Sequence, residues 1–70
     1  MTLIDKLPLK ALRARQGFTQ EYVAERVGVS RNTYGSWERY ETYPEIPQLI
    51  ILADIFECSL DTFYFPRDAS

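Results

Sequence analysis

The sequence predicts an all-α protein, a compact bundle of about five short helices. Along most of the chain, apolar residues recur three and four positions apart, the spacing that lines one helix face. No segment alternates apolar and polar residues long enough to make a convincing strand. The chain of 70 residues suffices for one small domain, residues 1–70, and a hydrophobic fraction of 46% favours a packed globule over disorder.

The first predicted helix covers about residues 8–16. Proline suits its first turn, and Gly17 suits its end because glycine readily adopts the left-handed conformation found just past helices. Its inner face is supplied by Leu9, Ala11 and Leu12.

The second predicted helix begins after Thr19, whose hydroxyl suits the N-cap position. Glu21 falls in the first turn, where a negative charge complements the helix dipole. The apolar residues at helical spacing are Tyr22, Val23, Ala24 and Val27. Gly28 then provides the left-handed residue that a tight turn needs.

The third predicted helix begins after Ser30 as its N-cap and continues to about Tyr40. Tyr34 and Trp37 lie three positions apart, so both point toward the same, inner side. Val29 helps to fix the turn that precedes this helix.

Two more helices are expected after a loop bracketed by Pro44 and Pro47. Pro47 suits the first turn of the fourth helix, which extends to about Glu57. Its wide buried stripe consists of Leu49, Ile50, Leu52, Ala53 and Phe56. Ser59 is the expected cap of a last short helix that ends at Pro66. That helix contains Leu60, Phe63 and Tyr64.

The segment at about residues 19–40 has the form of a helix-turn-helix, with "GVS" as its turn. Its order of "TQE", a mid-helix alanine, "GVS" and "WER" resembles the Cro/repressor-type helix-turn-helix family of phage and bacterial regulators. The stretches "LRARQGFTQ" and "LIILADIFECSLDTF" extend the resemblance over most of the chain. The resemblance implies a small transcriptional regulator of a phage or prophage genetic switch, which binds double-stranded operator DNA through the third helix.

The outer face of the third helix carries a polar stripe, because the two aromatic residues turn inward. The stripe consists of Arg31, Asn32, Gly35, Ser36 and Arg39. In the major groove, arginine can pair bidentately with guanine and asparagine with adenine, and small residues allow a close approach. The alternative interpretation is a solvated polar face without a partner.

The resemblance also assigns roles to single positions. Base reading falls to the start of the third helix and one turn later, here Arg31, Asn32 and Ser36, with Thr33 as a lesser candidate. Phosphate contacts are assigned to Gln20, Ser30 and Arg39. Gln20 could equally be an ordinary exposed residue at the start of its helix.

The same family resemblance suggests that Arg13 and Glu38 form an ion pair between the first and third helices. A partly buried pair would fix how the two helices cross, and removing one partner would cost a few kcal/mol. An exposed pair would contribute less than about 1 kcal/mol. Both residues are expected to have a structural role.

Charge is distributed unevenly along the chain. Residues 1–39 have a net charge of +3, whereas residues 40–70 have a net charge of −5. A DNA-binding module usually has a basic footprint, but "YETYPEIP" places Glu41 and Glu45 directly after the third helix. In addition, Tyr40 replaces the glycine that commonly ends this helix in the family. The alternative function is therefore a phage modulator or anti-repressor, which would bind a repressor protein with the same face.

The segment Phe63–Phe65 is unusually aromatic. An exposed aromatic patch there would serve a homodimer, and two half-sites would then add their binding energies. The alternative is that all three rings cover the small core.

Several classes of function are excluded by composition. Histidine is absent and Cys58 is the only cysteine, so zinc sites and histidine-based catalysis are not expected. The glycines are isolated and wrongly spaced for a phosphate loop. We therefore expect no enzyme activity, cofactor or metal. No signal peptide or membrane-spanning run is visible, which predicts a cytoplasmic protein, located at the nucleoid if it binds DNA.

Overall fold

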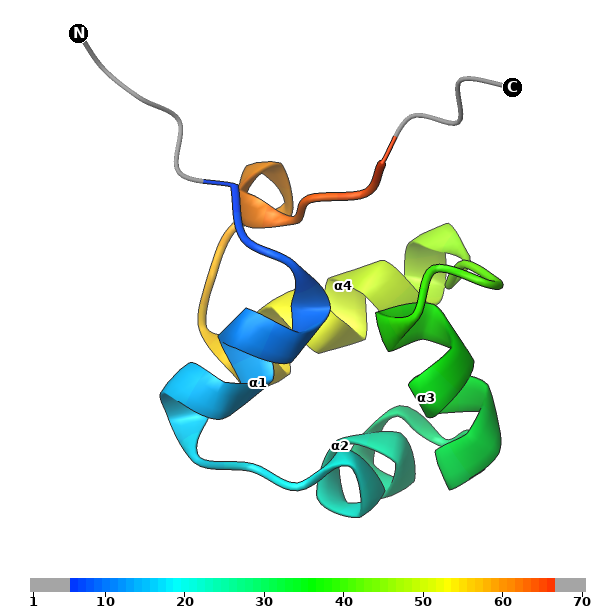
Figure 1. The fold of residues 1–70 in the computed structure, drawn as a ribbon. Coiled ribbons are helices and arrows are strands. Elements are labelled where there is room, and N and C mark those ends of the chain that lie inside the picture. Colours follow the sequence, from blue (N-terminus) through cyan, green and yellow to red (C-terminus); the bar gives the residue numbers. More distant parts are fainter. Residues whose placement is uncertain (1–5, 67–70) are drawn as a thin grey trace, which may run out of the picture.

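The computed structural model describes residues 6–66, and within that range it has four α-helices, one 3-10 helix and no named strand (Figure 1). The elements are α1 (Leu9–Gln16), α2 (Gln20–Val27), α3 (Arg31–Glu38), α4 (Ile46–Phe56) and η1 (Leu60–Thr62). The all-α prediction is confirmed, with four α-helices in place of about five. In Figure 1, α2 and α3 form one edge of the molecule, and η1 lies at the opposite edge.

The N-termini of α2 and α3 follow the local signals. The hydroxyl of Thr19 accepts a hydrogen bond from the Tyr22 N–H at 3.0 Å, and that of Ser30 accepts one from the Thr33 N–H at 3.0 Å. Each bond satisfies one of the N–H groups that a helix leaves free at its start. Pro8 lies at the N-cap of α1, one position before the first turn in which we expected it.

The two helices of the helix-turn-helix end in different ways. After α2, Gly28 is left-handed with φ of 93°, as expected. After α3, the left-handed residue is Tyr40, with φ of 61°. The Glu41 N–H donates to the Ser36 carbonyl at 2.9 Å and the Tyr40 N–H to that of Trp37 at 3.1 Å, which is a Schellman end. The helix thus stops at Glu38, two residues before the predicted end.

An aromatic cluster surrounds Tyr40 and accounts for a tyrosine at this position. Its ring centroid lies 6.4 Å from Tyr43, 6.2 Å from Tyr64 and 5.8 Å from Phe65. Its hydroxyl donates to the Tyr64 carbonyl at 2.9 Å. A left-handed residue other than glycine costs about 1 kcal/mol, and these contacts offset that strain.

The segment after α4 differs from the predicted fifth helix. The 3-10 helix η1 has only three residues, and the hydroxyl of Ser59 does not cap it. The next two residues are extended and pair with Leu7, whose N–H donates to Thr62 at 2.8 Å and whose carbonyl accepts from Tyr64 at 2.9 Å. Since this pairing requires an extended backbone, the helix cannot continue through Phe63 and Tyr64.

All four helices contribute to one core. The buried hydrophobic residues are Leu9, Leu12, Val23, Ala24, Tyr34, Trp37, Leu52, Phe56 and Phe63. The inward orientation of Tyr34 and Trp37 is therefore confirmed. The prediction that Ile50 is buried is wrong. Ile50 is 55% exposed, because helical spacing turns it away from the side of α4 that holds Leu52 and Phe56.

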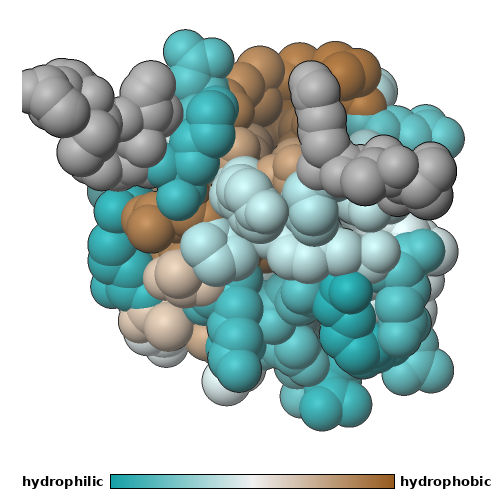
Figure 2. All heavy atoms as spheres, turned by 45° about the horizontal axis from the view of Figure 1, so that its top comes forward, coloured by the Kyte–Doolittle hydropathy of each residue, from teal (hydrophilic) through white to brown (hydrophobic). Residues whose placement is uncertain are grey.

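Some hydrophobic surface stays exposed. It belongs to Tyr22, Tyr43, Ile46, Ile50, Ile51, Leu60 and Tyr64. Figure 2 shows hydrophobic atoms gathered at one edge of that view, beside a broad hydrophilic face. Among residues 6–66, none of the helices is long and apolar enough to cross a membrane.

Candidate nucleic-acid interface

The first turn of α3 projects polar side chains from the molecule. Arg31, Asn32 and Thr33 are all exposed there, and Arg39 is exposed at the other end of the same helix. Their arrangement follows from the buried positions of Tyr34 and Trp37, which turn the opposite side of α3 outward. The structure thus leaves these four candidate residues exposed around the outer side of α3, and their base and phosphate contacts stay predictions.

Ser36 lies on this face, half-buried, and is held by two neighbours. Its hydroxyl donates to the Thr33 carbonyl at 2.7 Å and lies 2.5 Å from the Thr42 hydroxyl. Because the single Ser36 proton goes to the carbonyl, the Thr42 hydroxyl is the donor of the second bond. Sequence reasoning missed Thr42, since the chain reaches Ser36 only through the turn at Tyr40.

Gly35 is buried, although we expected it on the open face. A Cβ added to it would lie 3.3 Å from Arg39 Nη1 and 3.9 Å from Gln20 Oε1. These two long side chains therefore lie over the helix backbone at this point. Gly35 therefore lies beneath the Arg39 and Gln20 side chains and does not leave open space for a ligand.

Arg39 is already paired with a carboxylate from the following loop. Its Nε lies 3.1 Å from Glu41 Oε2, and its Nη2 donates to Glu41 Oε1 at 3.2 Å. The Nη2 contact is a hydrogen bond, and the Nε contact is an ion-pair distance. The two side chains are 59% and 60% exposed, so solvent screens the pair.

A second ion pair joins α1 to α3 beneath the polar face. Arg13 Nε lies 2.6 Å from Glu38 Oε2, with side chains that are only 17% and 4% exposed. Arg13 also donates to Glu38 Oε1 at 3.2 Å and to the Phe18 carbonyl at 3.0 Å. The predicted contact between these residues is confirmed, in its partly buried form. Arg13 therefore does not contribute to an outer basic surface.

Gln20 joins this buried pair. Its Nε2 donates to Glu38 Oε1 at 2.8 Å, and the residue is half-buried. A side chain that we assigned to phosphate contact thus also links the start of α2 to α3. No local signal indicates this bond, because Gln20 and Glu38 belong to different helices.

The buried pair shifts the acidity of both partners. Burial alone would raise the pKa of Glu38, but hydrogen bonds from Arg13 and Gln20 outweigh it and hold that pKa below its ordinary value. The hydrogen bond to Glu38 raises the pKa of Arg13. Burial, and after it the neighbouring Glu38 carboxylate, raises the pKa of Tyr34. The Tyr34 hydroxyl makes no hydrogen bond of ordinary geometry among residues 6–66.

The aromatic segment Phe63–Phe65 is mostly covered. Phe63 belongs to the core, and Phe65 is half-buried against Tyr40 and Tyr43. Tyr64 is 43% exposed. The segment therefore offers one partly exposed ring, not three, for self-association.

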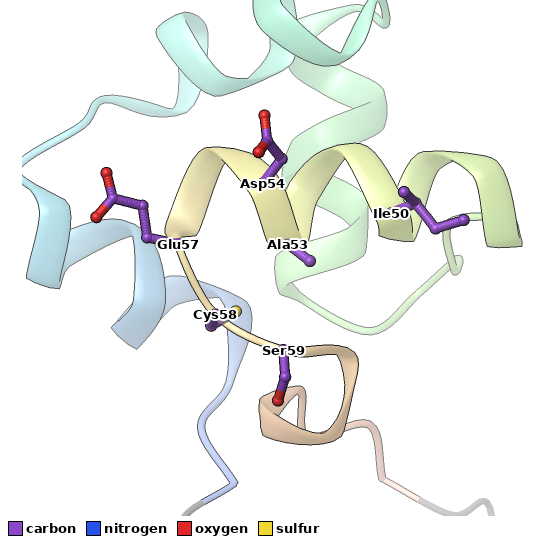
Figure 3. A pocket seen from close by; sticks show the side chains of 6 residues that line it. All are labelled: Ile50, Ala53, Asp54, Glu57, Cys58 and Ser59. Atoms are coloured by element: carbon purple, nitrogen blue, oxygen red, sulfur yellow. The ribbon is translucent and has the colours of Figure 1, made fainter.

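A hollow of about 640 Å³ lies near the end of α4 (Figure 3). Its lining residues are Ile50, Ala53, Asp54, Glu57, Cys58 and Ser59. Burial raises the pKa of the Cys58 thiol, which disfavours the reactive thiolate. Within residues 6–66, no group of three or more metal-ligating side chains is assembled. The hollow contains none of the residues predicted to read DNA.

Comparison with known proteins supports the assignment of the helices. The helix-turn-helix family model matches residues 9–63. Over 53 residues, the chain is 34% identical to the uncharacterized HTH-type transcriptional regulator YobD and 30% identical to the HTH-type transcriptional regulator AnsR, both from Bacillus subtilis (strain 168). Each alignment covers 76% of this chain but only 47% or 46% of the relative, so the chain spans less than half of each relative's length.

A solved structure is similar as well. It is the P22 c2 repressor protein in complex with synthetic operator 9T, with a TM-score of 0.72 and 31% sequence identity. The similarity covers 87% of this chain and 91% of that one. The named relatives are regulators, in agreement with the prediction that the chain is not an enzyme.

Proposed function

The chain belongs to the Cro/repressor-type helix-turn-helix family, and we propose that it is a transcriptional regulator that binds double-stranded operator DNA through the outer face of α3. The observation that carries this proposal is the exposed polar first turn of α3, projected outward by a complete helix-turn-helix. The similar repressor structure is a complex with operator DNA, which supports the same target. Helix α3 would enter the major groove while α2 lies across the backbone.

Base reading falls to the first two turns of α3. The Arg31 guanidinium can pair with guanine and the Asn32 amide with adenine, and both side chains are exposed. Thr33 and Ser36 lie on the same face, but their hydroxyls already bond within the protein. We therefore expect Arg31 and Asn32 to contribute more to sequence preference than Ser36.

Phosphate contacts would surround this reading surface. Ser30 and Arg39 lie at the two ends of α3, and Gln20 lies at the start of α2. The Gln20 amide has two hydrogens, and the bond to Glu38 uses one of them. The second hydrogen and the backbone N–H groups at the start of α2 would remain for phosphate.

The setting of this activity is part of the proposal. We propose a phage or prophage genetic switch in the bacterial cytoplasm, with two copies of the protein on the two half-sites of an operator. The segment Phe63–Phe65, through Tyr64, stays our predicted surface for the homodimer.

One observation favours a second candidate function. The pairing of Arg39 with Glu41 neutralises a cation of the candidate DNA-binding face, and residues 40–66 carry further carboxylates. An anti-repressor that binds a basic repressor protein would gain from such a surface, because acidic groups attract the repressor and repel DNA.

Titration with DNA from upstream of the protein's own gene, at several salt concentrations, separates the two functions. A regulator binds this DNA specifically and loses affinity steeply as salt rises. Arg31→Ala and Asn32→Ala should each weaken specific binding by about 1–3 kcal/mol. Arg15→Ala on α1, also exposed, removes an arginine outside the α3 face and is the matched control.

Two results would count against DNA binding through α3. Unchanged affinity in both α3 variants would refute the assignment of the reading residues. Absence of DNA binding, together with binding to a repressor protein, would favour the anti-repressor.

A further inference from the structure

The loop after α3 places a carboxylate at a proposed DNA contact. We propose that Glu41 lowers the affinity for DNA by competing with DNA phosphate for the guanidinium of Arg39. This inference rests on the proposed function, because it assigns a regulator of that same DNA-binding face. The proposed function concerns residues that bind DNA, whereas Glu41 would not itself bind DNA.

The position of the Arg39 guanidinium supports the competition. Its Nη2 donates to Glu41, its Nε lies 3.1 Å from the other carboxylate oxygen, and its third nitrogen, Nη1, lies 3.3 Å from where a Gly35 Cβ would be. The group is therefore bound at one edge by the carboxylate while it lies against the backbone of α3. Glu41 faces the edge formed by Nε and Nη2, so a phosphate that pairs bidentately through that edge displaces Glu41.

The position of Glu41 is built by the backbone and does not depend on the exposed ion pair. Its N–H donates to the Ser36 carbonyl at 2.9 Å, which fixes the residue one turn beyond α3. On one side, Tyr40 is held left-handed by the aromatic cluster. On the other side, Thr42 bonds Ser36. The backbone of Glu41 therefore lies next to Arg39 and the end of α3 whether or not the two side chains are paired.

The expected consequence is a loss of affinity that does not depend on the DNA sequence. Phosphate contacts supply most sequence-independent binding, whereas base contacts supply the preference for one site. If Glu41 withholds Arg39 from phosphate, every DNA sequence is bound more weakly, and the base contacts of Arg31 and Asn32 must supply more of the affinity.

The test uses the full chain and a random-sequence DNA duplex, since a phosphate contact requires no operator. Binding is measured by fluorescence anisotropy over a range of salt concentrations for wild type, Glu41→Gln, Arg39→Gln and the double variant. Glu45→Gln is the matched control: it removes an exposed carboxylate of the same loop that lies in no ion pair within residues 6–66. Urea unfolding of each variant verifies that the fold is kept.

We expect Glu41→Gln to tighten binding by about two- to fivefold. It should also steepen the dependence of log affinity on log salt by about 0.9, because one more cation becomes available to phosphate. Arg39→Gln should abolish most of this gain, so that Glu41→Gln has little effect in the double variant. Glu45→Gln should give a smaller gain that is the same with or without Arg39.

Three outcomes would overturn the inference. An equal gain from Glu41→Gln with and without Arg39 would mean that only general repulsion is relieved. Weaker binding by Glu41→Gln would mean that the carboxylate positions Arg39 for DNA instead of withholding it. If no variant binds either this duplex or the upstream DNA, the proposed function itself fails and the inference fails with it.

Discussion

Two ion pairs begin at adjacent residues, the last residue of α3 and its C-cap, and differ in almost every respect. Glu38 pairs with Arg13 beneath α3, with side chains 4% and 17% exposed, whereas Arg39 pairs with Glu41 in solvent. The first pair is completed by Gln20 and a backbone carbonyl, so its charges are satisfied away from water. Adjacent helical positions point about 100° apart. This rotation places Glu38 in a buried pair that stabilises the fold and Arg39 in an exposed pair at the surface.

The largest expected effect comes from breaking the buried pair. Glu38→Ala leaves the Arg13 guanidinium in a largely covered site and should lower the free energy of unfolding by about 3 kcal/mol. Glu41→Ala removes the exposed partner and should change it by less than about 1 kcal/mol. Urea unfolding of both variants measures the difference. Because a domain of this size has little stability to lose, Glu38→Gln is a milder second variant. Equal effects of the two alanine variants would contradict the comparison.

Acid should destabilise the fold through the buried pair. The pKa of Glu38 lies below its ordinary value in the folded protein, so the unfolded chain binds more protons as the pH falls. The stability from this group is fully present above the unfolded pKa of about 4.3 and is lost as the pH falls through the lower, folded value. Urea unfolding from pH 6 downward should show this loss in wild type and Glu41→Gln, and a smaller loss in Glu38→Gln. An identical pH profile in Glu38→Gln would assign the acid sensitivity to other carboxylates.

Tyr34 provides a finer probe of the buried region. Its hydroxyl is enclosed and has no hydrogen-bond partner among residues 6–66. Tyr34→Phe removes this unsatisfied group and keeps the ring, so it should raise the free energy of unfolding by about 1 kcal/mol. Thermal and urea unfolding would detect the gain. A loss of stability would show that the hydroxyl bonds Glu38 and belongs to the buried network.

The smallest expected effect concerns the loop that carries Glu41. Tyr40→Phe deletes the hydrogen bond to the Tyr64 carbonyl and should lower the free energy of unfolding by about 0.5 kcal/mol. Tyr43→Phe is the matched control, because Tyr43 lies in the same aromatic cluster but is 51% exposed. If the two variants lose the same stability, the hydroxyl of Tyr40 does not secure the loop.

Local signals were sufficient to predict most of the fold. Thr19 and Ser30 cap helices, and Gly28 turns left-handed, through contacts with residues at most a few positions away. The extended pairing of Tyr64 with Leu7 could not be predicted in this way, since its partner lies at the other end of the chain. For the same reason, the last element is shorter than the sequence suggests.

The candidate site was predicted less completely. The exposed first turn of α3 follows from the spacing of Tyr34 and Trp37. The packing of α2 against α3 determines that Gln20 bonds Glu38 and that the Gln20 side chain lies over Gly35. The spacing of residues within one helix does not predict such packing. The acidic composition of "YETYPEIP" indicated that phosphate binding would be weakened, but only the geometry identifies Arg39 as the cation that Glu41 engages.

The most direct test of DNA binding through α3 is a chemical-shift titration of the ¹⁵N-labelled protein with DNA from upstream of its gene. We expect the largest changes at Arg31, Asn32 and Arg39 and at the start of α2, with little change along the exposed side of α4 around Ile50. Changes concentrated on α4, or no changes at any DNA concentration at low salt, would contradict the assignment of α3 as the DNA-binding helix.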